Sequence, residues 1–374
     1  MSHTNRLSKH LPIARIAIVR SLPGLGDLLC AVPAMRALRA AFPQSHITLI
    51  GLAWAKTFVK RFSHYVDEFL EFPGYPGIPE IAPPVHEIPQ FLASVQQQRF
   101  DLALQMHGSG IISNTFTVLL GARVNAGFYL PGQYCPDADY FLPYPDHEPE
   151  VWRHLRLMDY LGIPLQGDAL EFPLGQEDFS ALHKVEEVQA LQKRKYVCIH
   201  PGASVPERRW SVEKFAAVAD AIAARGFQVV LTGTAPEANL THSIAQMMQA
   251  KPINLAGKTN LGALAALLSQ AELLICNDTG VSHLAAALGV KSVVIFTNSD
   301  PHRWAPLDCN IHRVLSSESV LLQTAETQRT QKGGNKGGDK EDNLISSFPY
   351  HSITPAMVMA QVDDLLSKEV ANVT

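Results

Sequence analysis

Residues 273–296 read LLICNDTGVSHLAAALGVKSVVIF, and this stretch decides the fold of the second half of the chain. Its two ends, 273–276 and 292–296, are short continuous apolar runs, which are typical of strands buried on both faces of a parallel sheet. Residues 281–288 between them are predicted to form a helix. A strand, a helix and a second strand in succession are the repeating unit of a parallel α/β sheet.

The same alternation extends outward from this stretch into both halves of the chain. Upstream of it we expect strands at 196–199 and 228–231, and helices at 212–225, 237–249 and 261–269. In the first half we expect strands at 16–19, 47–50 and 102–106, with one amphipathic helix over 28–41. Each half is therefore predicted to be a doubly wound, Rossmann-like α/β domain.

The length of 374 residues suits two domains of ordinary size. We predict an N-terminal domain over 1–175 and a C-terminal domain over 195–345, separated by the polar, charged stretch 176–195. The polar, glycine-rich region 315–347 is predicted to be a flexible insert, and helical spacing returns over 354–370.

The composition argues against several classes of function. A formal net charge of −4 provides no overall positive field for nucleic acid or for an anionic membrane. The 5 cysteines form no CxxC pair, which favours a reducing compartment, and the histidines show no metal-ligand clustering. Because we find neither a secretory signal nor a run of about 18 apolar residues, we expect a cytoplasmic protein, at most peripheral at the inner face of the membrane.

The first candidate site is the junction between strand 273–276 and the helix that follows it. Ligands of open parallel sheets bind at the carboxyl ends of strands, and a helix N-terminus offers unpaired N–H groups to a diphosphate. Asp278, Thr279, Gly280 and His283 lie at this junction. The alternative is an ordinary helix cap made by Asp278 or Thr279, with His283 packed in the core.

The loop after the first strand of the chain, 21–27, holds the second candidate. Its Gly24-Leu25-Gly26-Asp27 segment is neither a G-x-G-x-x-G fingerprint nor a P-loop, and a carboxylate here would repel a bound dinucleotide. Asp27 could instead accept a proton from an acceptor hydroxyl. The alternative is that Asp27 caps the following helix.

Further polar residues follow predicted strands at the same sheet edges. Ser204 and Arg208 lie in the loop after 196–199, where a cation would face phosphates or would simply be solvated. Glu237 would bind a ribose hydroxyl or begin its helix. His107 follows strand 102–106 and is an acceptor-side candidate, with a structural histidine as the simpler alternative.

Taken together, these segments resemble glycosyltransferase family 9, whose best-known members are the ADP-heptose:lipopolysaccharide heptosyltransferases. The resemblance runs from about residue 15 to residue 314. Residues 276–287 match the family signature D-[ST]-G-x-x-H-x-A-A. The Gly26-Asp27 pair and the His200-Pro201-Gly202 loop with Arg208 fit as well, and these pieces occur in order at the family's spacing.

The resemblance implies a GT-B architecture, in which two Rossmann-like domains face each other across a cleft. It also implies an inverting, metal-independent transfer without a cofactor, from ADP-heptose to a lipopolysaccharide-type or other glycan or glycolipid acceptor. Asp27 matches the family's general base. The residues assigned to donor binding are Gly26, Ser204, Arg208, Glu237, Asp278, Thr279, Gly280 and His283.

Three other functions compete with this one. A sugar-nucleotide epimerase of the same architecture should have several acid and base side chains around the anomeric centre of the donor, whereas the sequence offers a single carboxylate in the first loop. A nicotinamide-dependent oxidoreductase lacks its glycine fingerprint here. A non-catalytic nucleotide-sugar-binding relative would not need to retain Asp27. Residues 105–110 differ from the acceptor-side segment of core heptosyltransferases, and the family is therefore better defined than the sugar and the acceptor.

Overall fold

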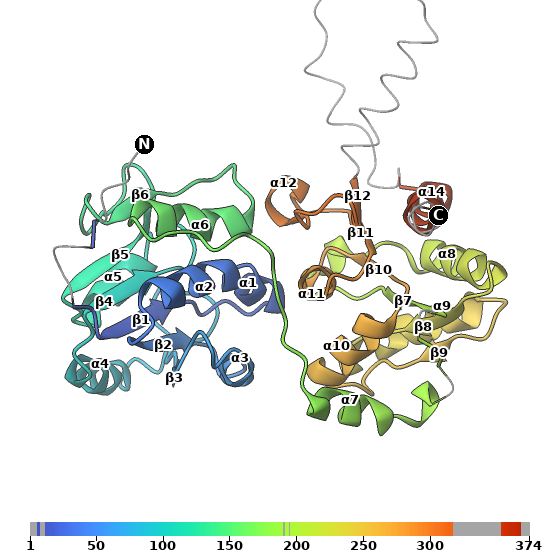
Figure 1. Cartoon of the computed structure of the whole chain (residues 1–374), viewed down its shortest axis with the longest axis horizontal. Coiled ribbons are helices and arrows are strands. Elements are labelled where there is room, and N and C mark those ends of the chain that lie inside the picture. Colours follow the sequence, from blue (N-terminus) through green and yellow to red (C-terminus); the bar gives the residue numbers. More distant parts are fainter. Residues whose placement is uncertain (1–5, 8–11, 190, 194, 317–352, 368–374) are drawn as a thin grey trace, which may run out of the picture. The chain divides into compact units, whose positions relative to one another are not determined.

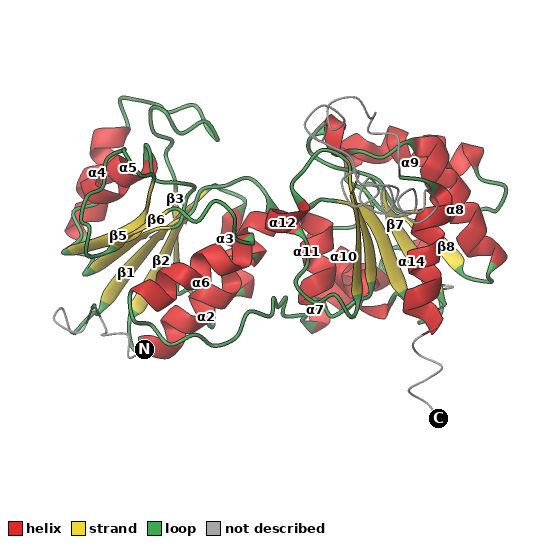
Figure 2. Cartoon of the chain, turned by 90° about the horizontal axis from the view of Figure 1, so that it is seen from above, coloured by secondary structure: helices red, strands yellow, loops and turns green. Residues whose placement is uncertain are grey.

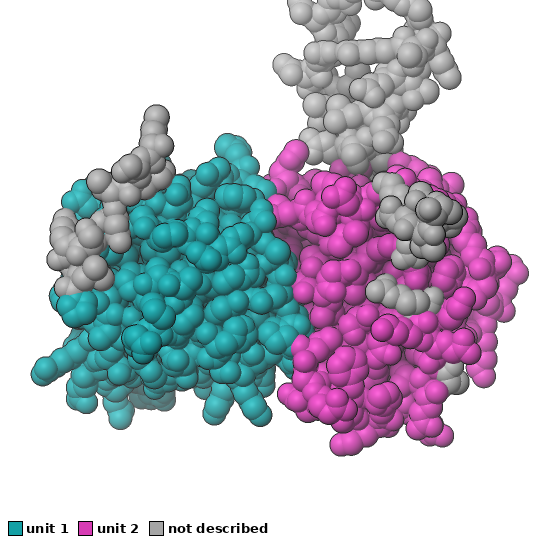
Figure 3. Space-filling model, in the orientation of Figure 1, with its two compact units in different colours: residues 1–173 teal, residues 174–374 magenta. Residues whose placement is uncertain are grey.

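The computed structural model describes residues 6–7, 12–189, 191–193, 195–316 and 353–367. The chain divides into two compact units, Met1–Pro173 and Leu174–Thr374 (Figure 3). Each unit is built on one six-stranded sheet whose neighbouring strands are all parallel. Residues 317–347 of the expected insert lie outside the described residues, as do the last three residues of the expected helix 354–370.

The first sheet has the strand order β3-β2-β1-β4-β5-β6 (Figure 1). Its strands are β1 (Arg15–Val19), β2 (His46–Gly51), β3 (Glu68–Glu71), β4 (Leu102–Gln105), β5 (Val124–Tyr129) and β6 (Phe141–Pro143). The strands at 16–19, 47–50 and 102–106 were expected from their apolar runs, and all three are present. The central strands β1, β2 and β4 are almost wholly buried, as such runs predict.

The second sheet has the order β12-β11-β10-β7-β8-β9. Its strands are β7 (Tyr196–His200), β8 (Gln228–Leu231), β9 (Ile253–Asn254), β10 (Leu273–Asn277), β11 (Ser292–Phe296) and β12 (His312–Ser316). Counted from the first strand of each unit, both sheets have the Rossmann order 3-2-1-4-5-6. The direction of winding therefore reverses between β1 and β4 in one unit and between β7 and β10 in the other.

Helices cover both faces of each sheet (Figure 2). In the first unit these are α1 (Leu25–Leu29), α2 (Val32–Ala41), α3 (Ala55–Arg61), α4 (Ile88–Gln97), α5 (Ser113–Leu119) and α6 (Glu150–Tyr160). In the second they are α7 (Gln176–His183), α8 (Val212–Ala224), α9 (Ala238–Met247), α10 (Leu261–Gln270), α11 (Gly280–Ala287), α12 (Pro301–Trp304) and α14 (Pro355–Ser367), with short 3-10 turns η2 (Glu186–Val188), η3 (Pro206–Arg208) and η4 (Ala235–Glu237).

One expected helix proved wrong. The single helix predicted over 28–41 is two helices, α1 and α2, with a break at Cys30 and Ala31. The N–H of Ala31 donates to the carbonyl of Leu28, three residues back, which ends the α-helical pattern. Pro33 occupies the first turn of α2, where proline needs no hydrogen-bond donor. The stretch 176–195 also begins with a helix, α7, which packs against α10.

The apolar core of the second unit includes α14, which comes after residues 317–352 in the sequence. Val358, Val362 and Leu365 of α14 pack into the same buried cluster as α8 and the sheet. The indole Nε1 of Trp210 donates to the carbonyl of Ile353 at 3.2 Å. None of the helices formed by the described residues is long and apolar enough to cross a membrane.

The core of the first unit contains a buried group of charged and titratable side chains. Helix α6 begins with Glu150, and its Oε1 lies 3.3 Å from Nε2 of His154 and 3.3 Å from Nη2 of Arg20. Burial, reinforced by the positive charges of Arg20 and Arg153, lowers the pKa of His154 to about 4, although Glu150 opposes the shift. His154 is therefore neutral in the folded protein at neutral pH.

We predict that this neutral histidine makes the first unit sensitive to mild acid. A histidine in the unfolded chain has a pKa of about 6.5, so the unfolded state binds the proton first as the pH falls. The stability that neutral His154 contributes is complete above about pH 6.5 and is lost progressively toward pH 4. Between pH 7 and pH 5 the wild-type protein should lose about 2 kcal/mol more than the His154→Gln variant.

Chemical denaturation of both proteins at the two pH values measures this difference. The comparison cancels the other titrating groups, because the two chains share them. Equal losses of stability in wild type and variant would show that His154 does not take up a proton on unfolding.

Candidate active site

The first candidate group lies in the loop that leaves the carboxyl end of β1. Asp27 is the third residue of α1, and its Oδ2 accepts a hydrogen bond from the N–H of Gly24 at 3.1 Å. Gly24 precedes the helix in an extended conformation, and Gly26 is buried inside the helix. The capping role that the sequence left open for Asp27 is therefore present in the structure, through a bond to the main chain at the helix start.

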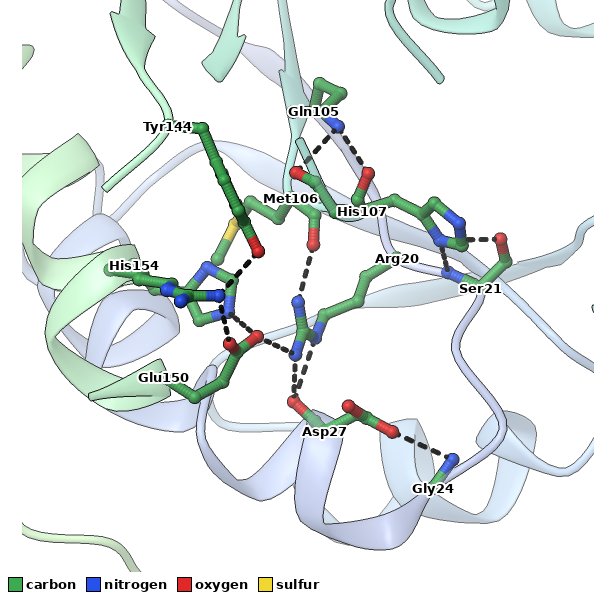
Figure 4. Close-up of polar contacts among 12 residues, drawn as sticks. Arg20, Ser21, Gly24, Asp27, Gln105, Met106, His107, Tyr144, Glu150 and His154 are labelled. Carbon is green, nitrogen blue, oxygen red and sulfur yellow. Dashed lines mark hydrogen bonds and ion pairs between the residues drawn. The ribbon is translucent and has the colours of Figure 1, made fainter. Parts of the chain in front are cut away.

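A buried arginine holds the main chain of the same residue. Arg20 follows β1, is 1 % exposed, and donates from both Nε and Nη2 to the carbonyl oxygen of Asp27, at 2.8 and 2.5 Å. Its Nη1 donates to the carbonyl of Met106 at 2.5 Å, just beyond β4 (Figure 4). The Asp27 position is thus connected to the ends of the two strands between which the winding of the sheet reverses.

His107 follows β4, the strand next to β1, and is buried. Its Nδ1 lies 3.1 Å from the hydroxyl of Ser21 and accepts from the Ser21 N–H at 3.3 Å, while its Nε2 lies 3.5 Å from Oε1 of Glu80. Burial would raise the pKa of Glu80, but its hydrogen bond with His107 holds it below the usual value. Both ring nitrogens of His107 therefore face partners within the unit, and its role toward an acceptor stays a prediction.

The second candidate group lies at the carboxyl ends of β7 and β10 in the other unit. Asn277, the last residue of β10, donates from Nδ2 to the carbonyl of Pro201 at 2.7 Å. Its Oδ1 accepts from the N–H of Trp210 at 3.0 Å. This single buried amide fixes the loop after β7 at both ends, because Pro201 begins that loop and Trp210 ends it.

Arg208 and Asp278 approach each other at this edge. Nη1 of Arg208 lies 3.6 Å from Oδ2 of Asp278, whose side chain is only 4 % exposed, whereas that of Arg208 is 33 % exposed. A guanidinium held beside a buried carboxylate and still open to solvent is placed to receive a phosphate.

The start of α11 follows directly after Asp278. Thr279 is the N-cap residue in an extended conformation, and its side chain makes no capping hydrogen bond. The hydroxyl of Ser282 donates to the carbonyl of Thr279 at 2.7 Å. The cap that the sequence offered as an alternative for Thr279 is therefore not made by its side chain. His283 is buried, and its ring packs edge-on against Trp304 at 6.1 Å between centroids.

Glu237 lies beside the glycine of the loop after β7. A Cβ added to Gly202 would come within 2.1 Å of the Glu237 carboxylate, so glycine is required for this approach. The same carboxylate accepts from the N–H and hydroxyl of Thr234, both at 2.8 Å, which makes it part of the helix start that the sequence left open. Burial lowers the pKa of His200, the residue at the end of β7, although Glu237 opposes the shift.

The structure therefore brings several of the predicted residues together within each unit. Arg208, Asp278, Thr279, Gly280 and His283 gather around the start of α11, and Glu237 lies against the loop after β7. Ser204 lies in that loop and is exposed. Gly26 lies beside Asp27 in the first unit, and its assignment to donor binding stays a prediction. Among the described residues, no three His, Cys, Asp or Glu side chains are grouped as metal ligands.

Arg20, Glu150 and Asn277 were not predicted from the sequence as site residues. Arg20 and Asn277 share one signal that could have found them, since each is a polar residue at the end of an otherwise apolar strand. Glu150 carries no such signal, because its partner Arg20 is 130 positions away in the sequence.

Known proteins resemble this chain over most of its length. The family model described as glycosyltransferase family 9 (heptosyltransferase) matches residues 88–333. Lipooligosaccharide heptosyltransferase 2 of Haemophilus influenzae is 24% identical over 92% of this chain and 97% of its own.

Two solved structures share the fold. One is a glycosyl transferase family 9 protein of Veillonella parvula, with a TM-score of 0.75 and 22% identity, covering 95% of this chain and 97% of the other. The second is the ADP-heptose lps heptosyltransferase II of E. coli, with a TM-score of 0.69 and 22% identity, covering 95% and 99%. The two parallel six-stranded sheets are those of the GT-B architecture. With the family model matching well over half of its length, the chain belongs to glycosyltransferase family 9, the heptosyltransferases.

Proposed function

We propose that this enzyme transfers heptose from ADP-heptose to a lipopolysaccharide-core or related glycan acceptor, with inversion at the anomeric carbon. The names of the similar proteins, a lipooligosaccharide heptosyltransferase and an ADP-heptose lps heptosyltransferase, support this donor and this acceptor. The main support for the proposal is the position of the site residues in the two sheets. Asp27 follows β1 in the first unit, and the Arg208 loop and Asp278 follow β7 and β10 in the second. The winding of each sheet reverses at these strands, which is where doubly wound sheets bind ligands.

The second unit would bind the donor. The Arg208 guanidinium and the N-terminal N–H groups of α11 would stabilise the charge that develops on the leaving diphosphate, so that no metal is required. Glu237, whose carboxylate lies against Gly202 in the loop after β7, would accept a hydrogen bond from a ribose hydroxyl. Asp278 would hold Arg208 in place through their contact.

The first unit would supply the base. As the acceptor oxygen attacks the anomeric carbon, its proton would pass to the Asp27 carboxylate and the bond from that carbon to the diphosphate oxygen would break. The electron pair of that bond would leave with ADP, and Asp27 would later release the proton to water. A single displacement of this kind inverts the anomeric configuration. It needs one carboxylate, in contrast to the pair used for hydrolysis of glycosides.

We predict that Asp27→Asn lowers the rate of transfer by about 10²–10⁴-fold, the usual contribution of a general base. The change in melting temperature caused by ADP should stay as in wild type, because Arg208 and the start of α11, which are proposed to bind the diphosphate, lie in the other unit. Asparagine keeps an oxygen that can accept from the Gly24 N–H, so the local fold should persist.

The chain offers a matched control for this variant. Asp178 has the same position in α7, third in the helix, with Oδ2 accepting from the N–H of Gly175 at 2.9 Å. Asp178→Asn perturbs an equivalent capping bond in the second unit, at a residue with no proposed role in transfer, and should leave transfer unchanged. Wild-type activity in Asp27→Asn would remove Asp27 from the role of base.

We predict that the protein responds to ADP and ADP-heptose in a thermal-shift screen more strongly than to UDP, GDP or NAD. A ligand present at 100 times its Kd stabilises by about 2.7 kcal/mol, which is several degrees for a unit of this size. Arg208→Ala should weaken ADP binding about 10–100-fold, since hydrogen bonds to charged groups contribute about 1.5–3 kcal/mol.

Arg225→Ala is the matched control for the loss of a cation. Arg225 pairs with Asp363 of α14 at 2.9 Å, at the end of α8 that leads into the amino end of β8. This variant should bind ADP as wild type does. A response to UDP or GDP alone would contradict ADP-heptose as the donor, and a response to NAD alone would overturn the assignment of the donor site.

A further inference from the structure

Arg20 is a fully buried cation that contacts the main chain of the proposed base. Its side chain is 0% exposed, and burial of an isolated guanidinium would cost several kcal/mol. Three acceptors compensate this cost: the carbonyl of Asp27, the carbonyl of Met106 and the carboxylate of Glu150 (Figure 4). The fork of the guanidinium spans all three acceptors, and the two shortest contacts, at 2.5 Å, are those to the carbonyls.

The carbonyl of Asp27 receives Arg20 because of the break between α1 and α2. In a continued helix this carbonyl would accept from the N–H of Ala31. That N–H instead donates to the carbonyl of Leu28. Arg20 and Asp27 are 7 positions apart, so the contact closes the β1–α1 loop at the residue that carries the proposed base.

Glu150, which contacts Arg20, also contacts a second arginine. Oε2 of Glu150 accepts from Nη1 of Arg153 at 3.3 Å. Arg153 also donates to the hydroxyl of Tyr144 at 2.6 Å and to the carbonyl of Asp146 at 2.5 Å. Both arginines are 2 % exposed or less and share one carboxylate, but Arg153 donates to α6 and to the segment before it.

We propose that Arg20 is a positioning residue of the transfer reaction, which holds the main chain of Asp27 so that its carboxylate meets the acceptor hydroxyl. Glu150 orients the guanidinium and balances its charge. The inference rests on the proposed role of Asp27 as base. Lysine cannot replace arginine here, since one ammonium group lacks the planar fork that holds the Asp27 carbonyl through two donors.

The test compares Arg20→Lys with Arg153→Lys, two equivalent changes around one carboxylate. We expect Arg20→Lys to lower kcat about 10–100-fold, the effect of misplacing a reacting group by roughly 1 Å. The KM for the donor should change less than about twofold, because the groups proposed to bind the donor diphosphate lie in the other unit. Arg153→Lys should keep kcat within about threefold of wild type, at an equal or larger loss of melting temperature.

A second variant, Glu150→Gln, keeps the shape of the side chain and leaves Arg20 in place without its charged partner. We expect it to lower kcat about 3–10-fold, again with donor KM unchanged. It also serves if Arg20→Lys does not fold. Equal loss of kcat in Arg20→Lys and Arg153→Lys would overturn the proposal, as would wild-type kcat in Glu150→Gln when Arg20→Lys cannot be obtained.

A double-mutant cycle separates this inference from the proposed function. If Arg20 acts through Asp27, adding Arg20→Lys to Asp27→Asn should lower the residual single-turnover rate by less than about threefold. A further 10–100-fold loss in that background would mean that Arg20 acts by another route. Wild-type activity in Asp27→Asn contradicts the proposed base itself, whereas an inactive Asp27→Asn with equivalent lysine variants contradicts only the role of Arg20.

Discussion

The pairing of the first with the fourth strand determines where the candidate site residues lie in each unit. β1 pairs with β4, and β7 with β10, so the loops that leave these strands emerge side by side at one edge of each sheet. The winding reverses there, and the connecting helices pass to opposite faces without covering that edge. Asp27 and His107 follow one pair, and the loop of Gly202 and Asp278 follow the other.

Each pair of strand ends is joined by a buried polar side chain, but the two units use different groups. The second unit uses the Asn277 amide, which has a donor and an acceptor and places no charge in the core. The first unit uses the charge of Arg20, which Glu150 balances, and burial together with this charge lowers the pKa of His154. An amide between main-chain groups suffices to fix a loop, whereas a charged fork also fixes one carbonyl through two donors.

Most strands and helix starts could be predicted from the sequence, because they depend on residues that are neighbours in the chain. Apolar runs such as Val229-Val230-Leu231 are sufficient to predict strands. The Asp278–His283 segment indicates the end of a strand followed by the start of a helix. The break between α1 and α2 was not predicted, because the helical spacing of apolar residues continues through it. Only Pro33 marks the start of the second helix. The contacts of Arg20 with Met106 and Glu150 join residues 86 and 130 positions apart, and no periodicity in a single sequence encodes such distances.

The capping bond between Asp27 and Gly24 does not by itself distinguish Asp27 from another helix cap of this chain. α7 makes the same arrangement with Gly175 and Asp178, so a glycine N-cap with an aspartate in the third position is sufficient to start a short helix. At Asp27 the chain adds a buried arginine, bonded twice to the carbonyl of the same residue, together with the carboxylate that compensates it. A helix start does not need that addition. Its physical effect is to restrict the main chain of Asp27, which matters most where a carboxylate must meet a second molecule in one geometry.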